Sequence, residues 1–390
     1  MLITMLSQTS VRIAQSTAPD LELAVHELHA GLVQPAMALV VIFCASVYDR
    51  PRLAAAITQL FGDTQVVGCT TAGEIGPTGI QNNSLVGVSF SADAFHAVAG
   101  LITDLQHFET QDVRKFAQKL LQDLEAQAPQ ANSQNSFGFL LIDGLSVREE
   151  PVIQALQTQL SIIPLVGGSA GDSLHLKSTH VFLNGRFYQD SAILLLINTS
   201  LPFKIFKTQH FMPTEQRMVV TAADVSRRAV MELNGLPAAY EYARLLGVEV
   251  NDLNARHFAA SPVVVTIAGN HYVRSIQRAN PDQSLTFYCA IEEGLVLRMA
   301  HGVDLLENLR QTFALVRSEI GQPQLTLAFD CVLRRLELDQ QGLTALAGEL
   351  LRENQAVGFN TYGEQYCGVH VNQTFAAIAI GNVSHESEYV

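Results

Sequence analysis

Residues 358–382, GFNTYGEQYCGVHVNQTFAAIAIGN, repeat the pattern of residues 68–90, GCTTAGEIGPTGIQNNSLVGVSF. Both stretches contain a glycine at a strand end, a Gly-Glu pair a few residues later, a polar loop and an apolar run. A third stretch, residues 167–197, keeps Ser169, Gly171 and Asp172 at comparable places. Glycine permits a positive φ or a close backbone approach, and a neighbouring carboxylate can accept N–H groups that the turn exposes. The sequence therefore predicts one unit, strand, glycine turn and hairpin, used several times.

Around this unit, helical and strand patterns alternate along the chain. Helical spacing predicts helices, and apolar runs predict buried strands between them. Asn184-Gly185 predicts a type I′ hairpin turn, and Asn234-Gly235 predicts a further turn. The expected helices cover residues 20–32, 50–62, 112–127, 151–160, 303–320 and 343–352, with a further helix that opens at Pro237, and the expected strands include residues 35–45, 64–73, 137–144 and 325–338.

These patterns predict an α/β protein with two related portions. Each portion would hold mixed β-sheets flanked by helices and built from the repeated strand, glycine-turn and hairpin units. The sequence pattern changes near Phe211, where several short strands are expected close together. We therefore expect an N-terminal portion over residues 1–205 and a C-terminal portion over residues 206–390.

Composition and charge exclude several classes of function. The 390 residues are 48% hydrophobic and 16% charged, with a net charge of −13. Such a charge repels nucleic acid and anionic lipid, so neither is expected as a partner. No apolar run has the length of a transmembrane helix, and the first residues lack the features of a signal peptide. We expect a cytoplasmic protein with no membrane partner.

The five cysteines favour reduced, buried thiols, because their number is odd and no C-x-x-C motif is present. Sequence motifs of nucleotide-binding loops, serine hydrolases and zinc proteases are also missing. We therefore expect no enzymatic activity. A thiol-dependent enzyme using Cys69 or Cys331 remains an alternative, although alternation along a strand would direct Arg334 away from Cys331.

Many ordered motifs resemble the FIST domain family of bacterial sensory modules, which have an N-terminal and a C-terminal portion. The motifs span nearly the whole chain: VVGCTTAGEI, LLIDGLS, PLVGGSAGD, FLNGRFYQDSAILLLI, YVRSIQ, SLTFYCAIEEGLVL, LAFDCVLRR and GFNTYGEQYCGVHVNQTFAAIAI. Within that family, HFMPTEQRMVVTAADVSRRAVMELNGLPAAYEYA and YCGVHVNQTF are similar to the nitric-oxide-sensing NosP subgroup.

The resemblance implies a sensor that binds a small ligand. For the subgroup the ligand would be haem b, the signal nitric oxide, and the output a histidine kinase or cyclic-di-GMP enzyme. Because the sequence ends eight residues after Asn382 with no attached output domain, we expect this partner to act in trans. The wider family implies the alternative of a sensor for amino acids or another metabolite, without haem.

Haem requires an axial ligand, usually a neutral imidazole, and groups that meet its propionates. His370, inside the closing motif, is the first candidate for the metal ligand, followed by His210, His257 and His271. Arg217, with Arg186 and Arg274, could pair with propionates. We set aside His96 and His180, which lie in strand-like surroundings without a matching second group.

The repeated turns themselves are the expected lining of the ligand pocket. If the two portions face each other, their turns would bring backbone donors and carboxylates to one crevice, because ligand sites favour strand ends and domain interfaces. The expected pocket residues are Gly73, Glu74, Gly171, Asp172, Gly363 and Glu364.

Overall fold

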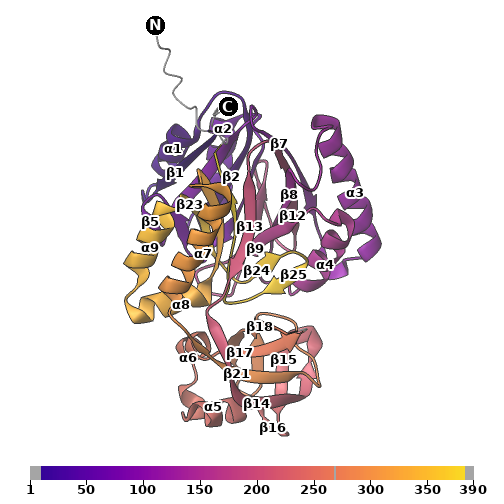
Figure 1. Ribbon diagram of the computed structural model, residues 1–390, viewed down its shortest axis with the longest axis vertical. Helices are drawn as coiled ribbons and strands as arrows, with labels where there is room; N and C mark the ends of the chain where they lie inside the picture. The colour runs from indigo at the N-terminus through magenta and orange to yellow at the C-terminus, as the bar shows by residue number, and fades with distance from the viewer. Residues whose placement is uncertain (1–9, 268, 383–390) are drawn as a thin grey trace, which may run out of the picture.

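The computed structural model describes residues 10–267 and 269–382 (Figure 1). The first nine and last eight residues, which bear on the expectations about a signal peptide and the chain end, lie outside the described residues. Within the described residues, the fold is an α/β body of three sheets with a smaller β-rich domain below it in Figure 1. The expected mixed sheets flanked by helices are thus confirmed.

The body consists of three repeats with the same order of elements. Repeat 1 comprises β1 (Val11–Ser16), α1 (Leu21–Leu32), β2 (Met37–Ala45), α2 (Arg50–Phe61), β3 (Val66–Thr71), β4 (Glu74–Gly76), β5 (Gly79–Gln81) and β6 (Leu85–Ser91). Repeat 2 comprises β7 (Phe95–Ile102), the 3-10 turn η1 (Leu105–His107), α3 (Thr110–Gln127), β8 (Ser136–Ile142), α4 (Glu149–Leu160), β9 (Leu165–Ser169), β10 (Val181–Leu183), β11 (Arg186–Tyr188) and β12 (Ala192–Thr199).

Repeat 3 follows the same order but is interrupted after its first strand. It comprises β13 (Phe203–Thr208), α7 (Leu305–Ile320), β22 (Leu325–Cys331), α8 (Val332–Gln341), α9 (Thr344–Glu353), β23 (Ala356–Thr361), β24 (Glu364–Tyr366), β25 (Val369–Val371) and β26 (Phe375–Ile380). Residues 211–302 form the inserted domain between β13 and α7. The expected division at residues 205 and 206 falls within β13.

Each repeat gives its hairpin to the sheet of another repeat. The sheet of repeat 1 has the order β1-β6-β2-β3-β10-β11 and so ends in the hairpin of repeat 2. The sheet of repeat 2 ends in the hairpin β24–β25 of repeat 3, and the sheet of repeat 3 ends in the hairpin β4–β5 of repeat 1. This cyclic exchange binds the three repeats into one body.

The inner faces of the three sheets share one apolar core. Phe43 of the first sheet lies 4.7 Å from Phe359 of the third, and Phe139 of the second lies 5.3 Å from Phe329, measured between ring centroids. The helices cover the outer faces, where separate apolar clusters join α1 and α2, α3 and α4, and α7 and α9 to their sheets. Strands that are buried on both faces explain the unbroken apolar runs in the sequence.

One glycine in each repeat is required by close strand packing. A Cβ at Gly68, Gly167 or Gly358 would collide with the carbonyl oxygen of the neighbouring parallel strand. These three glycines therefore occupy one structural position, as the registers of the parallel pairs also show. By this alignment Gly171 and Asp172 match Ala72 and Gly73, one residue away from the correspondence expected from the sequence.

The inserted domain holds a sheet of order β18-β17-β21-β14-β15-β20-β19, in which β16 pairs with β15. Its elements are β14 (Phe211–Asp224), η2 (Val225–Arg227), β15 (Ala229–Leu233), β16 (Leu236–Pro237), α5 (Ala238–Leu246), η3 (Val250–Asp252), α6 (Ala255–Ala260), β17 (Val263–Ile267), β18 (Asn270–Arg274), β19 (Ile276–Ala279), β20 (Leu285–Phe287) and β21 (Val296–Gly302). The turns at Asn184-Gly185 and Asn234-Gly235 have the positive φ angles that their sequences predict.

The expected strand over residues 325–338 is wrong in its second half. The strand β22 ends at Cys331, and α8 begins at Val332. Arg334 therefore lies on a helix, and its Nε donates to Asp330 at 2.7 Å, one helical turn earlier. The strand-based estimate of where Arg334 points consequently does not apply.

Candidate functional site

The three exchanged hairpins can be superimposed residue by residue through their hydrogen bonds. The carbonyl oxygens of Gly73, Gly363 and His180 each accept a backbone N–H from the strand that receives the hairpin, at 2.7, 2.8 and 2.9 Å. The three donors are Asn360, Ser169 and Thr70, which lie at matching points after the close-packed glycines. His180 therefore occupies the position of Gly73 in repeat 1 and of Gly363 in repeat 3.

The same superposition matches the residues in the middle of each second hairpin strand. Phe187 pairs with Phe182, His370 with Gln365, and Ile80 with Ile75. Phe187, His370 and Ile80 are thus equivalent. An imidazole occurs in two of the three hairpins, but at different positions: His370 belongs to the facing pair of repeat 3, whereas His180 of repeat 2 matches Gly363, two residues before the facing pair.

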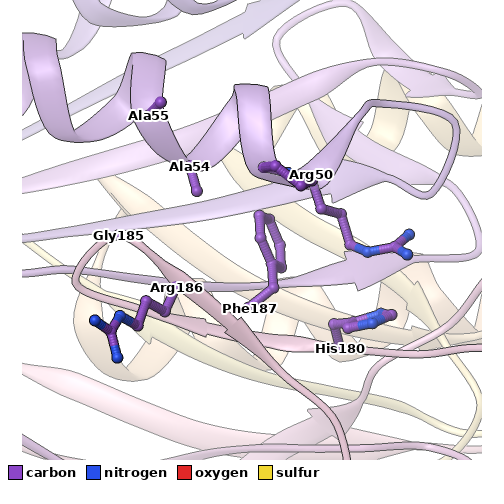
Figure 2. Close-up of a pocket in the computed structure, with 8 residues that line it drawn as sticks. Arg50, Ala54, Ala55, His180, Gly185, Arg186 and Phe187 are labelled. Atoms are coloured by element: carbon purple, nitrogen blue, oxygen red, sulfur yellow. The ribbon is translucent and has the colours of Figure 1, made fainter.

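A groove of about 520 Å³ lies between the hairpin of repeat 2 and the helix α2 (Figure 2). Its lining residues are Arg50, Pro51, Ala54, Ala55, His180, Gly185, Arg186 and Phe187. Figure 2 shows α2 above the groove and the hairpin residues below it, with Arg50 extending toward His180. The groove has apolar walls, one imidazole and two guanidinium groups.

Where it lines the groove, the helix α2 carries the small side chain of Ala54. The helices α2 and α4 end in matching C-caps, Gly62 and Ser161, and Ala54 and Ile153 lie the same number of residues before them. Ile153 is completely buried in the cluster between α4 and its sheet. Alanine at the matching position of α2 offers less side-chain volume and lines the groove.

His180 has the properties of a neutral ligand. Its side chain is buried, with 7% of the residue exposed, and its Nδ1 atom has no hydrogen-bond partner in the part of the chain that the structure describes. Burial, with a smaller contribution from the charge of Arg50, lowers the pKa of His180 to about 4. The imidazole is therefore neutral at physiological pH, the form that coordinates metals.

The two groove arginines add positive charge that no carboxylate balances locally. Neither Arg50 nor Arg186 makes an ion pair with any residue that the structure describes. Phe187 lies 6.3 Å from the His180 ring, nearly perpendicular to it. An unpartnered imidazole, two free cations and an aromatic wall together favour a ligand that is flat, apolar in its centre and acidic at its edge.

His370, the first candidate from the sequence, lies in a closed hairpin. Its residue is 2% exposed, and its ring nitrogens face the amide nitrogens of Gln365 at 3.3 Å and Asn372 at 3.5 Å. Burial lowers the pKa of His370. Above it, Gln157 of α4 lies close to Gly368 at the hairpin turn. Coordination by His370 would require these neighbours to move.

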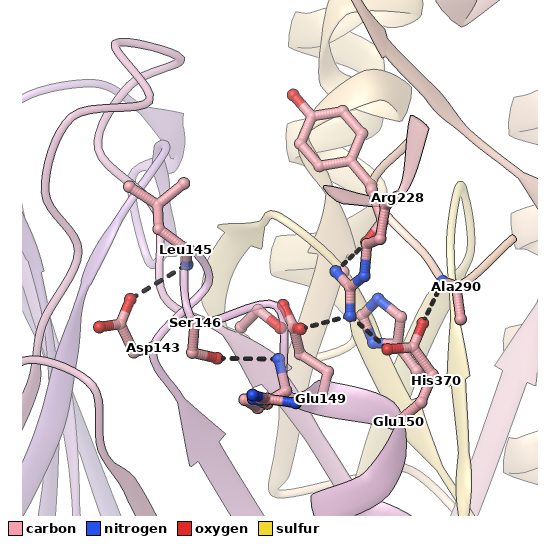
Figure 3. Close-up of polar contacts among 12 residues, drawn as sticks. Asp143, Leu145, Ser146, Glu149, Glu150, Arg228, Ala290 and His370 are labelled. Carbon is pink, nitrogen blue, oxygen red and sulfur yellow. Dashed lines mark hydrogen bonds and ion pairs between the residues drawn. The ribbon is translucent and has the colours of Figure 1, made fainter. Parts of the chain in front are cut away.

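His370 instead borders the joint between the body and the inserted domain, shown in Figure 3. Arg228 of the inserted domain donates to Glu149 at 2.7 Å and also pairs with Glu150. The N–H of Ala290 donates to Glu150 at 2.6 Å. These buried contacts, which we call the domain joint, hold the inserted domain against α4.

The remaining candidates are not brought together. His210 is buried where the chain enters the inserted domain, with Nε2 at 2.9 Å from Glu337 and Nδ1 at 3.1 Å from Arg334. Both its ring nitrogens are thus engaged. His257 lies on α6 with Nδ1 unpartnered among the described residues, and Nδ1 of His271 contacts Thr266 at 2.9 Å. Arg217 is exposed on β14.

The acidic residues of the glycine turns are used within the fold. Glu74 accepts from the N–H and hydroxyl of Ser84, both at 2.9 Å, and Glu364 does the same with Thr374 at 3.1 and 2.7 Å. Burial raises the pKa of Glu74, and raises the pKa of Glu364 to about 8.

The turns are neighbours, as expected. The N–H of Ala72 donates to Asn360, that of Gly171 to Thr70 and that of Tyr362 to Ser169. The four described cavities are lined by other residues, so a pocket formed by Gly73, Glu74, Gly171, Asp172, Gly363 and Glu364 remains a prediction.

The thiols of the alternative enzyme hypothesis are buried. Burial raises the pKa of both Cys69 and Cys331 well above the usual value of a thiol. Each is therefore held as the unreactive thiol, since the thiolate is the nucleophile.

The sequence analysis set His180 aside because it lies in strand-like surroundings without a matching second group, and residues 170–179 separate it from the strand β9. The available signal was the Asn184-Gly185 turn. His180 precedes this turn by as many residues as Gly363 precedes the turn at Cys367-Gly368. The two residues therefore occupy the same position of the repeated unit.

Comparisons with known proteins agree with the repeated motifs. The FIST N domain matches residues 38–236, and the FIST C domain matches residues 238–367. An uncharacterized protein of Methanocaldococcus jannaschii is 23% identical over 218 residues, which cover 54% of this chain and 41% of that relative. The matched region thus spans less than half of the relative's length.

Two further observations concern the described residues alone. None of their helices combines the length and apolar character needed to cross a membrane. Nor do they contain a group of three or more histidine, cysteine, aspartate or glutamate side chains arranged to hold a metal ion.

Proposed function

Because the chain belongs to the FIST family, whose domains are sensors of small ligands in signal transduction, we propose that it is a haem-based sensor of nitric oxide. Haem b is proposed to bind in the groove between α2 and the hairpin of repeat 2. The output is proposed to reach a separate histidine kinase or cyclic-di-GMP enzyme in the cytoplasm. The observation that supports this site is the unpartnered, neutral imidazole of His180 in a groove with two unpaired arginines.

The groove residues suit the parts of haem b. His180 would supply the axial nitrogen, and its low pKa keeps it free of a competing proton. Arg50 and Arg186 would meet the two propionates as charge-assisted donors. Ala54, Ala55 and Phe187 would cover the apolar ring faces. When bound, ferrous haem supplies the iron that captures nitric oxide.

The experiment is a titration of the purified chain with hemin, followed by reduction and exposure to nitric oxide. We expect a Soret band that shifts with nitric oxide and is lost or strongly weakened in His180→Ala. The variants His210→Ala, His257→Ala, His271→Ala and His370→Ala should keep the parent spectrum if folded. The exposed His107 provides a control, His107→Ala. Loss of the band in His370→Ala alone would assign the ligand to His370 and overturn the proposed site.

A second candidate function is a sensor of amino acids or a related metabolite that uses no haem. The observation that favours it is a cavity of about 260 Å³ beside the domain joint, where Arg148, Arg228 and Glu150 meet. Groups of both charges at a domain interface suit a zwitterion. A chain that binds no hemin but is stabilised thermally by amino acids would support this candidate.

A further inference from the structure

We propose that residues 172–180, here called the strap, couple the groove to the packing of the inserted domain. The inference rests on the proposed function, because it assigns a regulatory role to the same site. One end of the strap is His180 in the groove. The other end begins at Asp172 beneath the inserted domain.

The strap is held in a conformation that its residues disfavour. Ser173, Leu174 and Leu176 have φ angles of 58°, 66° and 53°, in the left-handed region. For residues other than glycine this region is costly, and bulky residues are found there infrequently. Such strain persists where surrounding contacts impose it, and it concentrates at functional and switch segments. Because three such residues occur within four positions, the strap is a segment with a strained backbone.

A single carboxylate imposes the conformation. Asp172 accepts the backbone N–H groups of Leu176, Lys177 and Ser178 at 2.8, 2.7 and 2.9 Å. The hydroxyl of Tyr362 donates to the same carboxylate and accepts the N–H of Leu174 at 3.0 Å. Asp172 and Tyr362 thus form a clamp on the strap, and one half of that clamp belongs to repeat 3.

The strained leucines lie against the inserted domain. Leu174 and Leu176 pack on an apolar cluster that contains Ala259 and Tyr288 of the inserted domain. The rings of Tyr288 and Tyr362 are 5.9 Å apart, and the carbonyl of Tyr288 accepts from Arg228 at 2.7 Å. The clamp, the strap and the domain joint are therefore contiguous.

This arrangement gives a ligand at His180 a route to the inserted domain. The end of the strap is held by Thr70, whose hydroxyl accepts the His180 N–H at 3.0 Å and whose N–H donates to the His180 carbonyl at 2.9 Å. A ligand that displaces the imidazole would act on these bonds, and a small displacement there can open the strained turns. The leucines would then leave the cluster and loosen the inserted domain. Because coupling free energies are reciprocal, weakening the clamp should also strengthen binding in the groove.

The first test needs no ligand and uses hydrogen exchange of the full chain. Asp172→Asn and Tyr362→Phe should raise exchange at least fivefold both in α6, whose Ala259 shares an apolar cluster with the strap leucines, and in residues 180–188, which follow the strap. Asp20→Asn, which alters the exposed N-cap of α1, is the matched control and should change neither. An increase in exchange confined to residues 172–178, with exchange unchanged in α6 and in residues 180–188, would overturn the coupling.

The second test adds hemin to the same variants. We expect hemin to raise exchange in α6 of the parent chain, and Tyr362→Phe to bind hemin about three- to tenfold more tightly. Leu174→Gly/Leu176→Gly, which removes the strain, should bind hemin but transmit no change to α6. Hemin binding without any change in α6 of the parent would reject the strap and retain the sensor. Absence of hemin binding would reject the proposed haem site, and the ligand-free test would still decide the coupling.

Discussion

The hairpins of repeats 2 and 3 occupy the same place in the fold, yet one borders an open groove and the other is closed. Both add two strands to a neighbouring sheet beneath a helix. Beside the hairpin of repeat 3, α4 places Gln157 near Gly368 and carries Ile153 where α2 carries Ala54, and His370 is packed among amides. Beside the hairpin of repeat 2, α2 carries Ala54, and Nδ1 of His180 is buried with no hydrogen-bond partner among the described residues. A few side chains thus convert a structural repeat into a candidate site.

The largest effect is expected where all three repeats are alike. Alanine at Gly358 would bring its Cβ into the carbonyl of Ala328, so Gly358→Ala should displace a central strand and prevent recovery of folded protein. Gly167→Ala and Gly68→Ala should behave in the same way. Gly348→Ala is the milder comparison, because its Cβ would come within 3.3 Å of backbone, a tight contact but not a collision, and it lies on a helix. Near-wild-type melting of any of the first three variants would break the equivalence of the repeats.

The next effect tests why one hairpin is closed. Ile153→Ala should cost about 2–5 kcal/mol, because it removes a fully buried side chain and leaves a cavity. The reverse change, Ala54→Ile, should narrow the groove, cost about 1–3 kcal/mol because Ala54 is buried, and abolish hemin binding. Urea unfolding measures the first quantity and hemin titration the second. Unchanged hemin affinity in Ala54→Ile would show that the groove does not hold the ligand.

Much of the repeated architecture could be predicted from the sequence, because it depends on local patterns. The apolar runs identified buried strands, and Asn184-Gly185 and Asn234-Gly235 identified turns. The exchange of hairpins could not be predicted, since the alternation of a short strand does not specify which sheet edge it joins.

The candidate site was hidden for a different reason. The strap separates His180 in sequence from the strand β9 of its repeat. In addition, Gly171-Asp172 resembles the Gly-Glu pairs of repeats 1 and 3 but lies one residue away from the matching position. The difference between Ala54 and Ile153 becomes meaningful once the C-caps Gly62 and Ser161 are matched in space.

A third prediction concerns the acid that repeats 1 and 3 have and repeat 2 lacks. Val181 occupies the place of Glu74 and Glu364, as their strand pairing shows. Burial raises the pKa of Glu364 to about 8 in the folded chain, so between pH 4.5 and 8 the folded state retains a proton that the unfolded state loses. Stability should therefore fall as pH rises through this window, by a few kcal/mol at most, at about 1.4 kcal/mol per pKa unit.

Glu364→Gln cannot ionise, and its stability should vary less between pH 5 and pH 9 than that of the parent. Chemical unfolding at both pH values makes the comparison. Glu74→Gln is the companion variant, because burial raises the pKa of Glu74 as well. Equal pH dependence in the parent and in Glu364→Gln would mean that Glu364 is already ionised in the folded chain at pH 5.

The smallest effect is expected from the charges at the rim of the groove. Arg50→Gln and Arg186→Gln should each weaken hemin binding about three- to tenfold at low salt, because each removes one charge-assisted partner of a propionate. The loss should shrink as salt screens these partly exposed groups. Arg52→Gln, on the same helix but paired with the exposed Glu22, should leave the affinity unchanged. If Arg52→Gln weakened binding as much as Arg50→Gln, the attraction would come from the general charge of α2 and not from the groove, and the contrast between the two hairpins would then depend on shape alone.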